Sequence, residues 1–121
     1  MKLIRTNEFR RMPNPSPGAP FRAEILTAQH QAKELGGIFG LLPPSGEMRC
    51  HYHRNRESII VVWSGEATVI VEGEEFVMRP GDILHIAAGE RHGSVNRSDE
   101  DFRFFEFFTY PPLASDFVEV A

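Results

Sequence analysis

The sequence contains a single cysteine, Cys50, so no disulfide can form within the chain. This excludes the class of small secreted scaffolds that disulfides hold together, and it suits a reducing compartment. The basic residues near the N-terminus are not followed by the apolar segment that a secretory signal requires. We therefore expect a cytoplasmic protein.

Long apolar runs and an excess of positive charge are also missing. The longest apolar run, around residues 59–63, has about six residues, far fewer than the ~20 of a membrane-spanning helix. Lysine and arginine number 13 against 17 acidic residues, which gives a net charge of −4. Nucleic-acid-binding domains carry a basic patch or stripe instead. We therefore expect a small molecule as the ligand, and neither a membrane nor a nucleic acid as a partner.

Helical patterns are scarce, and short apolar segments take their place. Only residues 27–35 look helical, and they are few enough to form a turn or loop. Four prolines between residues 13 and 20 predict an irregular arm over residues 1–20. From residue 21 to 121 we expect one domain, an all-β sandwich or barrel, because apolar segments and turn residues alternate about every eight to twelve positions. The expected strands cover residues 21–27, 36–42, 48–53, 58–63, 66–71, 75–78, 83–86, 93–96 and 102–110.

Three histidines form the clearest chemical signal. His51 and His53 are two positions apart in an expected strand, so their side chains point to the same face. His92 comes from a separate strand-turn-strand unit, and a barrel can bring it to the same place. Imidazole is a good ligand for divalent transition metals. The pattern predicts one such ion per chain, with Zn, Fe, Mn, Ni and Cu all open.

The segments around these histidines resemble the two sequence motifs of the cupin family. The first motif, G-x5-HxH-x3,4-E-x6-G, is matched over residues 46–65 by Gly46, His51, His53, Glu57 and Gly65. The second, G-x5-PxG-x2-H-x3-N, is matched over residues 73–96 by Gly73, Gly89, His92 and Asn96. Gly46 is one residue closer to the histidines than the pattern, and Ala87 replaces a proline, which should loosen the turn before His92. The resemblance implies a double-stranded β-helix, the jelly-roll cupin barrel, with the three histidines as metal ligands.

The fourth ligand of the family is ambiguous in this chain. Counting forward from His53 points to Glu57, whereas counting back from Gly65 points to Ser58. Neighbouring residues of a strand face opposite sides, so only a local bulge would turn Glu57 inward. The sequence leaves open whether Glu57 is a metal ligand, a catalytic carboxylate, or an outward residue with Ser58 in the pocket.

Further polar residues are candidates for the pocket. His85 could line it as an extra polar group or as a donor to a metal ligand. Glu106 interrupts the apolar strand 102–110, where an unpaired carboxylate is costly to bury. It is either the partner of an arginine, such as Arg49 or Arg103, or a catalytic acid or base with a raised pKa.

The end of that strand resembles the cupins that process unsaturated uronic acids in pectin breakdown. In their D-x-F-S-P-P-R pattern, Glu106 matches the aspartate and Phe108 the phenylalanine, both of which line the site in those proteins. Tyr110 is an insertion, and Leu113 stands in place of the arginine that grips the sugar carboxylate. The resemblance implies a sugar-acid pocket that lacks the usual arginine.

Three functions agree with these residues. The first is a metal-dependent enzyme that isomerises or tautomerises a sugar or sugar acid, with Glu106 or Glu57 moving the proton. The second is an Fe(II)-dependent dioxygenase, and the third is a small-molecule-binding or sensor module without catalysis. We also expect a homodimer, in which the arm and residues 21–27 extend a neighbour's sheet and the phenylalanine-rich strand supplies a buried interface.

Overall fold

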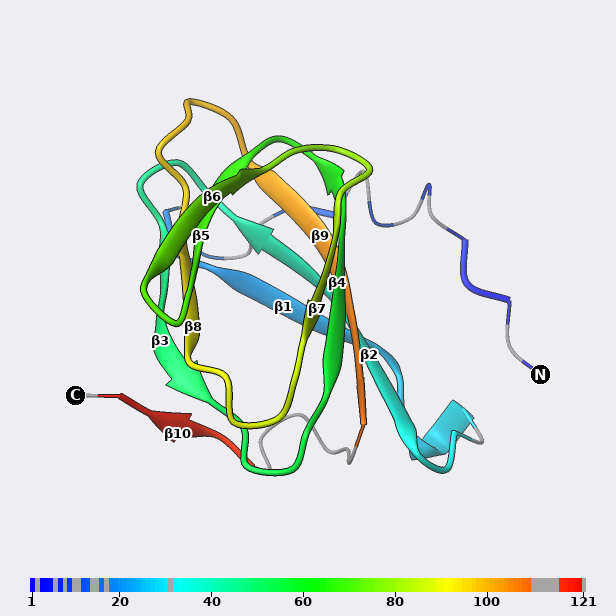
Figure 1. Cartoon of the computed structure of the whole chain (residues 1–121). Helices are drawn as coiled ribbons and strands as arrows, with labels where there is room; N and C mark the ends of the chain where they lie inside the picture. Colours follow the sequence, from blue (N-terminus) through cyan, green and yellow to red (C-terminus); the bar gives the residue numbers. More distant parts are fainter. Residues whose placement is uncertain are drawn as a thin grey trace.

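The computed structural model describes residues 1, 3–5, 7, 9, 12–13, 16, 18–30, 32–109 and 116–120, with the backbone alone at residue 30. Within this part, ten strands form two five-stranded antiparallel sheets that face each other (Figure 1). The strands are β1 (Phe21–Leu26), β2 (Leu35–Leu42), β3 (Glu47–Tyr52), β4 (Ser58–Ser64), β5 (Ala67–Val71), β6 (Glu74–Met78), β7 (Ile83–Ile86), β8 (His92–Val95), β9 (Phe102–Thr109) and β10 (Val118–Glu119). The predicted jelly-roll barrel is confirmed.

Each of the nine expected strands is present, with ends within about two residues of the predicted ones. One sheet has the order β1-β2-β9-β4-β7 and the other β10-β3-β8-β5-β6, so strands distant in sequence become neighbours. The helix-like stretch contains only a single 3-10 turn, Ala28–His30. The short strand β10 was not expected. It pairs with β3 at the open end of the barrel (Figure 1).

The core fills the space between the two sheets. Alternate residues of each strand point inward, and the inward set on β9 is Phe102, Phe104 and Phe108. They pack against aliphatic side chains of both sheets, among them Ile38, Leu42, Val62, Val69 and Met78. The three histidines lie beside this packing, because Phe102, Phe104 and Val69 of the core line the same cavity as they do.

A second apolar cluster covers the outer face of the sheet that contains β9. Phe9 of the N-terminal arm lies with its ring centroid 5.6 Å from that of Phe39 and 5.7 Å from that of Phe105. The strand is therefore apolar on both faces, as predicted, because both faces are covered. Phe9 of the chain's own arm contributes to this cover, and a dimer interface at β9 stays a prediction. Strand β1 pairs with β2 of the same chain and forms the edge of the sheet, so the expected extension of a neighbour's sheet also stays a prediction.

Asn96, the last residue of the second motif, has a structural role. Its buried side-chain amide donates to the carbonyl oxygens of Leu42 (2.9 Å) and Glu100 (2.7 Å). Its backbone N–H donates to the carbonyl of Gly46. A side chain at Gly46 would come within 2.9 Å of the Pro43 carbonyl oxygen, which explains a glycine at this position despite the shortened spacing.

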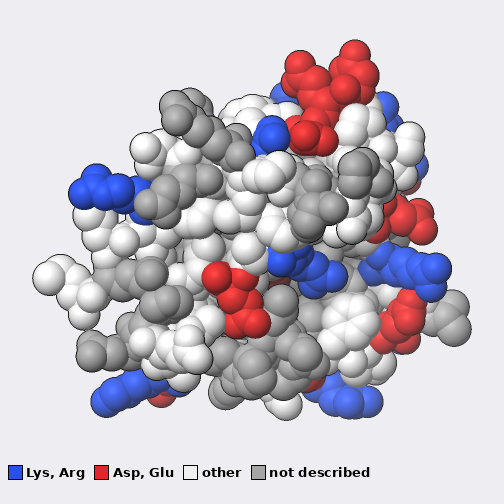
Figure 2. All heavy atoms as spheres, turned by 180° about the vertical axis from the view of Figure 1, so that it is seen from behind, with Lys and Arg blue, Asp and Glu red and all other residues white. Residues whose placement is uncertain are grey.

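Charged groups of both signs are interspersed on the surface in Figure 2, with acidic side chains gathered at its upper edge. Among the described residues, no helix has the length and apolarity needed to cross a bilayer.

Candidate metal centre

The structure brings the three histidines together. His51 lies on β3 and His53 directly follows it, while His92 begins β8 and pairs with His51 across the sheet. One ring nitrogen from each residue can be chosen so that all three lie within 4.8 Å of one another. All three side chains are buried. This spacing suits three ligands around one ion, so the histidines could hold a divalent metal.

Backbone carbonyl groups orient each imidazole ring. Nδ1 lies 2.7 Å from the Arg49 carbonyl oxygen in His51 and 2.9 Å from the Glu90 carbonyl oxygen in His92. In His53 it lies 2.6 Å from the carbonyl oxygen of Asp116. A carbonyl oxygen only accepts, so Nδ1 carries the proton in each ring and Nε2 keeps its lone pair for a ligand. Metal-binding histidines are usually held in this way.

The three rings are also kept neutral. Burial is the main cause that lowers the pKa of His51 to about 4; the hydrogen bond to the Arg49 carbonyl raises it, and the charges of His92 and His53 lower it. Burial likewise lowers the pKa of His53 and of His92. A neutral imidazole is the form that binds a metal. The site therefore has its ligands in the binding form at neutral pH.

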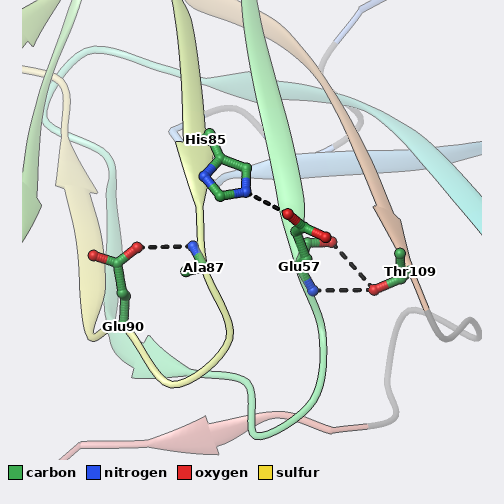
Figure 3. Close-up of polar contacts among 5 residues, drawn as sticks. All are labelled: Glu57, His85, Ala87, Glu90 and Thr109. Atoms are coloured by element: carbon green, nitrogen blue, oxygen red, sulfur yellow. Dashed lines mark hydrogen bonds and ion pairs between the residues drawn. The ribbon is translucent and has the colours of Figure 1, made fainter.

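The structure places Ser58 inward and Glu57 outward. Ser58 is 2% exposed and pairs with Phe108 of β9, whereas the Glu57 side chain is 59% exposed. The backbone N–H of Glu57 donates to Thr109 Oγ1 at 3.0 Å (Figure 3). The Thr109 backbone N–H donates to the Glu57 carbonyl, also at 3.0 Å. These bonds hold the regular register without the bulge that an inward Glu57 would need. Glu57 is therefore not placed as a metal ligand or as a catalytic group.

His85 shares the outer face with Glu57. In the pairing of β4 with β7 it stands opposite Ile59, and its Nε2 lies 2.5 Å from Glu57 Oε1 (Figure 3). Its side chain is 54% exposed. The expectation that His85 lines the pocket was wrong, because strand alternation directs it to solvent.

The turn before His92 is closed despite Ala87. The Ala87 N–H donates to Glu90 Oε1 at 2.8 Å (Figure 3), and the Glu90 N–H donates to the Ala87 carbonyl at 3.2 Å. Proline has no N–H and could not make the first of these bonds. The expected loosening was wrong, since Glu90 holds the turn and also orients His92.

Glu106 lies inside the barrel and lines the same cavity as the histidines. The empty space of this cavity, its mouth included, is about 650 Å³. Burial raises the pKa of Glu106, while the nearby Ser58 hydroxyl and the charges of Arg22 and Arg56 work against it. The suggested arginine partners are engaged elsewhere, Arg49 with Glu119 and Arg103 with Asp101. Among the described residues Glu106 has no ion pair.

Two arginines of the cavity were missed by the sequence reasoning. Arg22 of β1 and Arg56 of the loop before β4 both line it. Arg56 is 2% exposed, its guanidinium carbon lies 4.4 Å from the Phe108 ring centroid, and burial lowers its pKa. Phe108 therefore lies behind Arg56 and does not line the cavity itself. An arginine on an edge strand or in a loop resembles an ordinary surface charge, so no sequence signal could have found either.

The Ser58 hydroxyl is buried near the Glu106 carboxyl group, whose pKa it lowers. Tyr110 and Leu113, on which the comparison with the uronate-processing cupins depended, lie outside the described residues.

Comparison with known proteins agrees with this geometry. The chain is 31% identical over 105 residues to the beta-D-galactosidase Rv1717 of Mycobacterium tuberculosis, covering 82% of this chain and 85% of that protein. A conserved protein with a double-stranded beta-helix domain from Klebsiella pneumoniae superimposes with a TM-score of 0.80 at 24% identity, over 100% of this chain and 98% of the other. A cupin sugar phosphate isomerase from Silicibacter pomeroyi superimposes with a TM-score of 0.64 at 26% identity, over 75% and 60%.

The profile of the cupin domain matches residues 39–108, which include all three histidines and Glu106. This match spans more than half of the chain. The chain therefore belongs to the cupin family.

Proposed function

We propose that this cupin is a metal-dependent enzyme that isomerises or tautomerises a small sugar acid. One observation carries the proposal: three neutral imidazoles, one carboxyl group with a raised pKa and two arginines line a single cavity. Cavities that combine perturbed titratable groups with a possible metal site are typical of enzymes.

His51, His53 and His92 would hold one divalent ion, with Nε2 of each ring as the ligand atom. When bound, such an ion polarises a carbonyl or hydroxyl oxygen of the substrate. The inward position at the start of β4 is Ser58, and its short neutral side chain leaves room beside the histidines. The ion would keep open positions for a substrate, as catalytic sites require.

Glu106 would move the proton. Its raised pKa lies closer to neutral pH, which suits a group that both accepts and donates a proton. Glu106 can then take a proton from a carbon beside a carbonyl group of the substrate and return it to a neighbouring atom. Glu106 is the sole carboxylate among the described residues that line the cavity, and residues 110–115 contain no acid. Hydrolysis by a pair of carboxylates would need a second one. The cavity therefore favours proton transfer within one substrate.

Arg22 and Arg56 favour a substrate with a carboxylate or another anionic group. Guanidinium groups bind carboxylates through charge-assisted hydrogen bonds. The three neutral histidines add no charge, so the positive charges of the two arginines exceed the negative charge of Glu106 even before a metal ion binds. The similarity of this chain to a beta-D-galactosidase and to a sugar phosphate isomerase supports a sugar as the remainder of the substrate. In the uronate-processing cupins, an arginine at the position of Leu113 binds the sugar carboxylate. Arg22 and Arg56 would bind it in this chain.

The test has two stages. Elemental analysis of protein purified without chelator should find about one Fe, Mn, Ni, Cu or Zn per chain, and the double variant His51→Ala, His53→Ala should have lost it. The loaded protein is then incubated with uronic acids in D2O, and NMR follows deuterium uptake beside the carbonyl carbon. Glu106→Gln should abolish uptake and keep the metal, whereas Glu57→Gln, which changes a glutamate outside the cavity, should leave uptake unchanged. Retained metal in the histidine variant, or uptake that survives Glu106→Gln, would overturn the proposal.

A dioxygenase is the second candidate, because three histidines without a carboxylate ligand leave open positions for O2 as well. Oxygen consumption by the Fe(II)-loaded protein would favour it over isomerisation. A binding module would instead bind sugar acids without exchange or turnover.

A further inference from the structure

The described C-terminal residues 116–120 return to the metal centre. Strand β10 pairs with β3, with Val118 opposite Tyr52 and Glu119 opposite His51, and the Val120 N–H donates to the Cys50 carbonyl at 3.0 Å. In Figure 1, β10 lies beside β3 at the open end of the barrel. The segment therefore extends the sheet alongside the strand that carries His51.

Asp116 connects this segment to the loop after β3 by two separate groups. Its carboxylate accepts the backbone N–H groups of Arg54 (2.6 Å), Asn55 (2.6 Å) and Arg56 (3.0 Å). Its own carbonyl oxygen lies 2.6 Å from His53 Nδ1. The φ angle of Asp116 is 56°, a left-handed conformation that is uncommon outside glycine and is tolerated best by Asp and Asn. This conformation is held by the bonds on both sides.

His53 differs from the other two histidines in what orients it. His51 and His92 each bond to the carbonyl two residues before them in the chain, so local backbone geometry holds those rings. The carbonyl for His53 comes from 63 positions further along the chain. Among the described residues this is the one hydrogen bond to the His53 ring, and without it the ring would lose the preference for a proton on Nδ1.

Phe117 covers another side of the same site. Its ring is stacked on His51, with centroids 4.6 Å apart and planes at 25°, and it lies 6.1 Å from the His53 ring. It lines both the barrel cavity and an adjoining surface groove, as do Arg22 and Met48. Phe117 is thus part of the wall between the metal ligands and solvent, although 45% of it remains exposed.

We propose that Asp116 and Phe117 are positioning residues of the metal centre: the Asp116 carbonyl fixes the tautomer and direction of His53, and the Phe117 ring shields the His51 side of the site. Both act on the metal centre proposed above, so their role in the enzyme rests on that function. The barrel motifs alone then make an incomplete site, which the C-terminal segment completes.

The first test uses the wild-type protein without metal, labelled with 15N at histidine. Long-range 15N–1H correlation spectra distinguish the two tautomers of each ring. His53 should carry its proton on Nδ1, as should His51 and His92. A His53 ring protonated on Nε2 would overturn the role of Asp116, whether or not the protein binds a metal.

The second test measures Zn²⁺ and Ni²⁺ affinity by competition with a chromophoric chelator. Asp116→Gly accepts the left-handed backbone but removes the carboxylate that anchors the carbonyl, and its affinity should fall about tenfold or more. Asp116→Asn should recover most of it, because asparagine tolerates the same φ and keeps an acceptor oxygen. Glu119→Gln lies in the same segment but meets only Arg49 at the surface, and should match the wild type. A folded Asp116→Gly protein with wild-type affinity and an unchanged His53 tautomer would overturn the proposal.

The third test addresses Phe117 through the rate at which EDTA removes the ion. Phe117→Ala should raise this rate severalfold and Phe117→Leu much less, because leucine still covers His51. Equal rates in all three proteins would remove Phe117 from the proposal. If the wild-type chain binds neither Zn²⁺ nor Ni²⁺, the proposed function fails, and the tautomer of His53 still decides the contact with Asp116.

Discussion

Glu57 and His85 meet on the outer face of the barrel, where Glu57 Oε1 lies 2.5 Å from His85 Nε2. Both come from segments that carry or flank the cupin motifs, and either could be taken for a site residue. The side chains of this pair are exposed, whereas Ser58, the residue after Glu57, is buried on the inner face of β4. The chemistry of the centre therefore does not include this pair.

Replacing Glu57 should leave the metal in place. Glu57→Gln removes an exposed charge that contacts only His85 and keeps the backbone bonds to Thr109, so we expect wild-type metal content. The loss in stability should be about 0.5 kcal/mol, as for other exposed ion pairs. Elemental analysis and thermal unfolding measure both, with His85→Gln as the matched variant. Loss of the metal in either protein would return this pair to the list of possible ligands.

Acid should destabilise the metal-free protein through His51. Its pKa is about 4 in the folded chain against 6.5 in the unfolded chain, so the unfolded chain takes up the proton first as the pH falls. The stability that His51 contributes is fully present above pH 6.5 and is lost between pH 6.5 and about 4. Melting temperatures of EDTA-treated protein across this range should fall less steeply in His51→Gln than in wild type. Parallel curves would contradict a lowered pKa at this residue.

Arg22 should select for an anionic ligand. Galacturonate and galactose differ in a carboxylate, and we expect the loaded wild-type protein to bind galacturonate more tightly. Arg22→Gln should weaken galacturonate binding by about tenfold or more, because a charge-assisted hydrogen bond contributes about 1.5–3 kcal/mol. Binding of galactose should change little. Calorimetry on Arg97→Gln, which removes an arginine that contacts Glu75 at the surface, controls for overall charge. Equal losses for both sugars would argue against a carboxylate contact.

The N-terminal arm should contribute to stability through Phe9. Its ring is buried against Phe39 and Phe105, and truncation to alanine should cost about 3 kcal/mol. Leu3→Ala, at an exposed position of the same arm, should cost less than about 0.5 kcal/mol. Urea unfolding of the two variants gives the comparison. Similar midpoints would mean that the arm does not hold this sheet face in solution.

Assembly as a homodimer stays a prediction. Ile59 and Ile83 remain 42% and 67% exposed on the outer face of β4 and β7, and edge strands of a jelly roll readily pair. Light scattering should give about twice the chain mass of 13.7 kDa. A mass near 14 kDa over a wide concentration range would contradict it.

The sequence by itself determined where the strands lie and that two of the three candidate ligands, His51 and His53, point to the same side. Alternation with period two and turn residues such as Gly65 are local properties, so the nine main strands could be located within about two residues. The same alternation predicts that the side chains of His51 and His53 lie on one face of the sheet. It also predicts that the side chains of Glu57 and Ser58 lie on opposite faces. The motifs indicated the barrel, because their order and spacing belong to one fold family.

Only the tertiary structure decided which of two adjacent residues faces the cavity, since the bonds that hold Glu57 outward come from Thr109, more than 50 positions away. It also decided which charges join the histidines. Arg22 enters from an edge strand, and the carbonyl that orients His53 comes from Asp116. Sequence patterns report the period of a single strand, whereas these contacts depend on how separate strands are placed beside one another. That placement is set by the packing of two sheets, and no local pattern contains it.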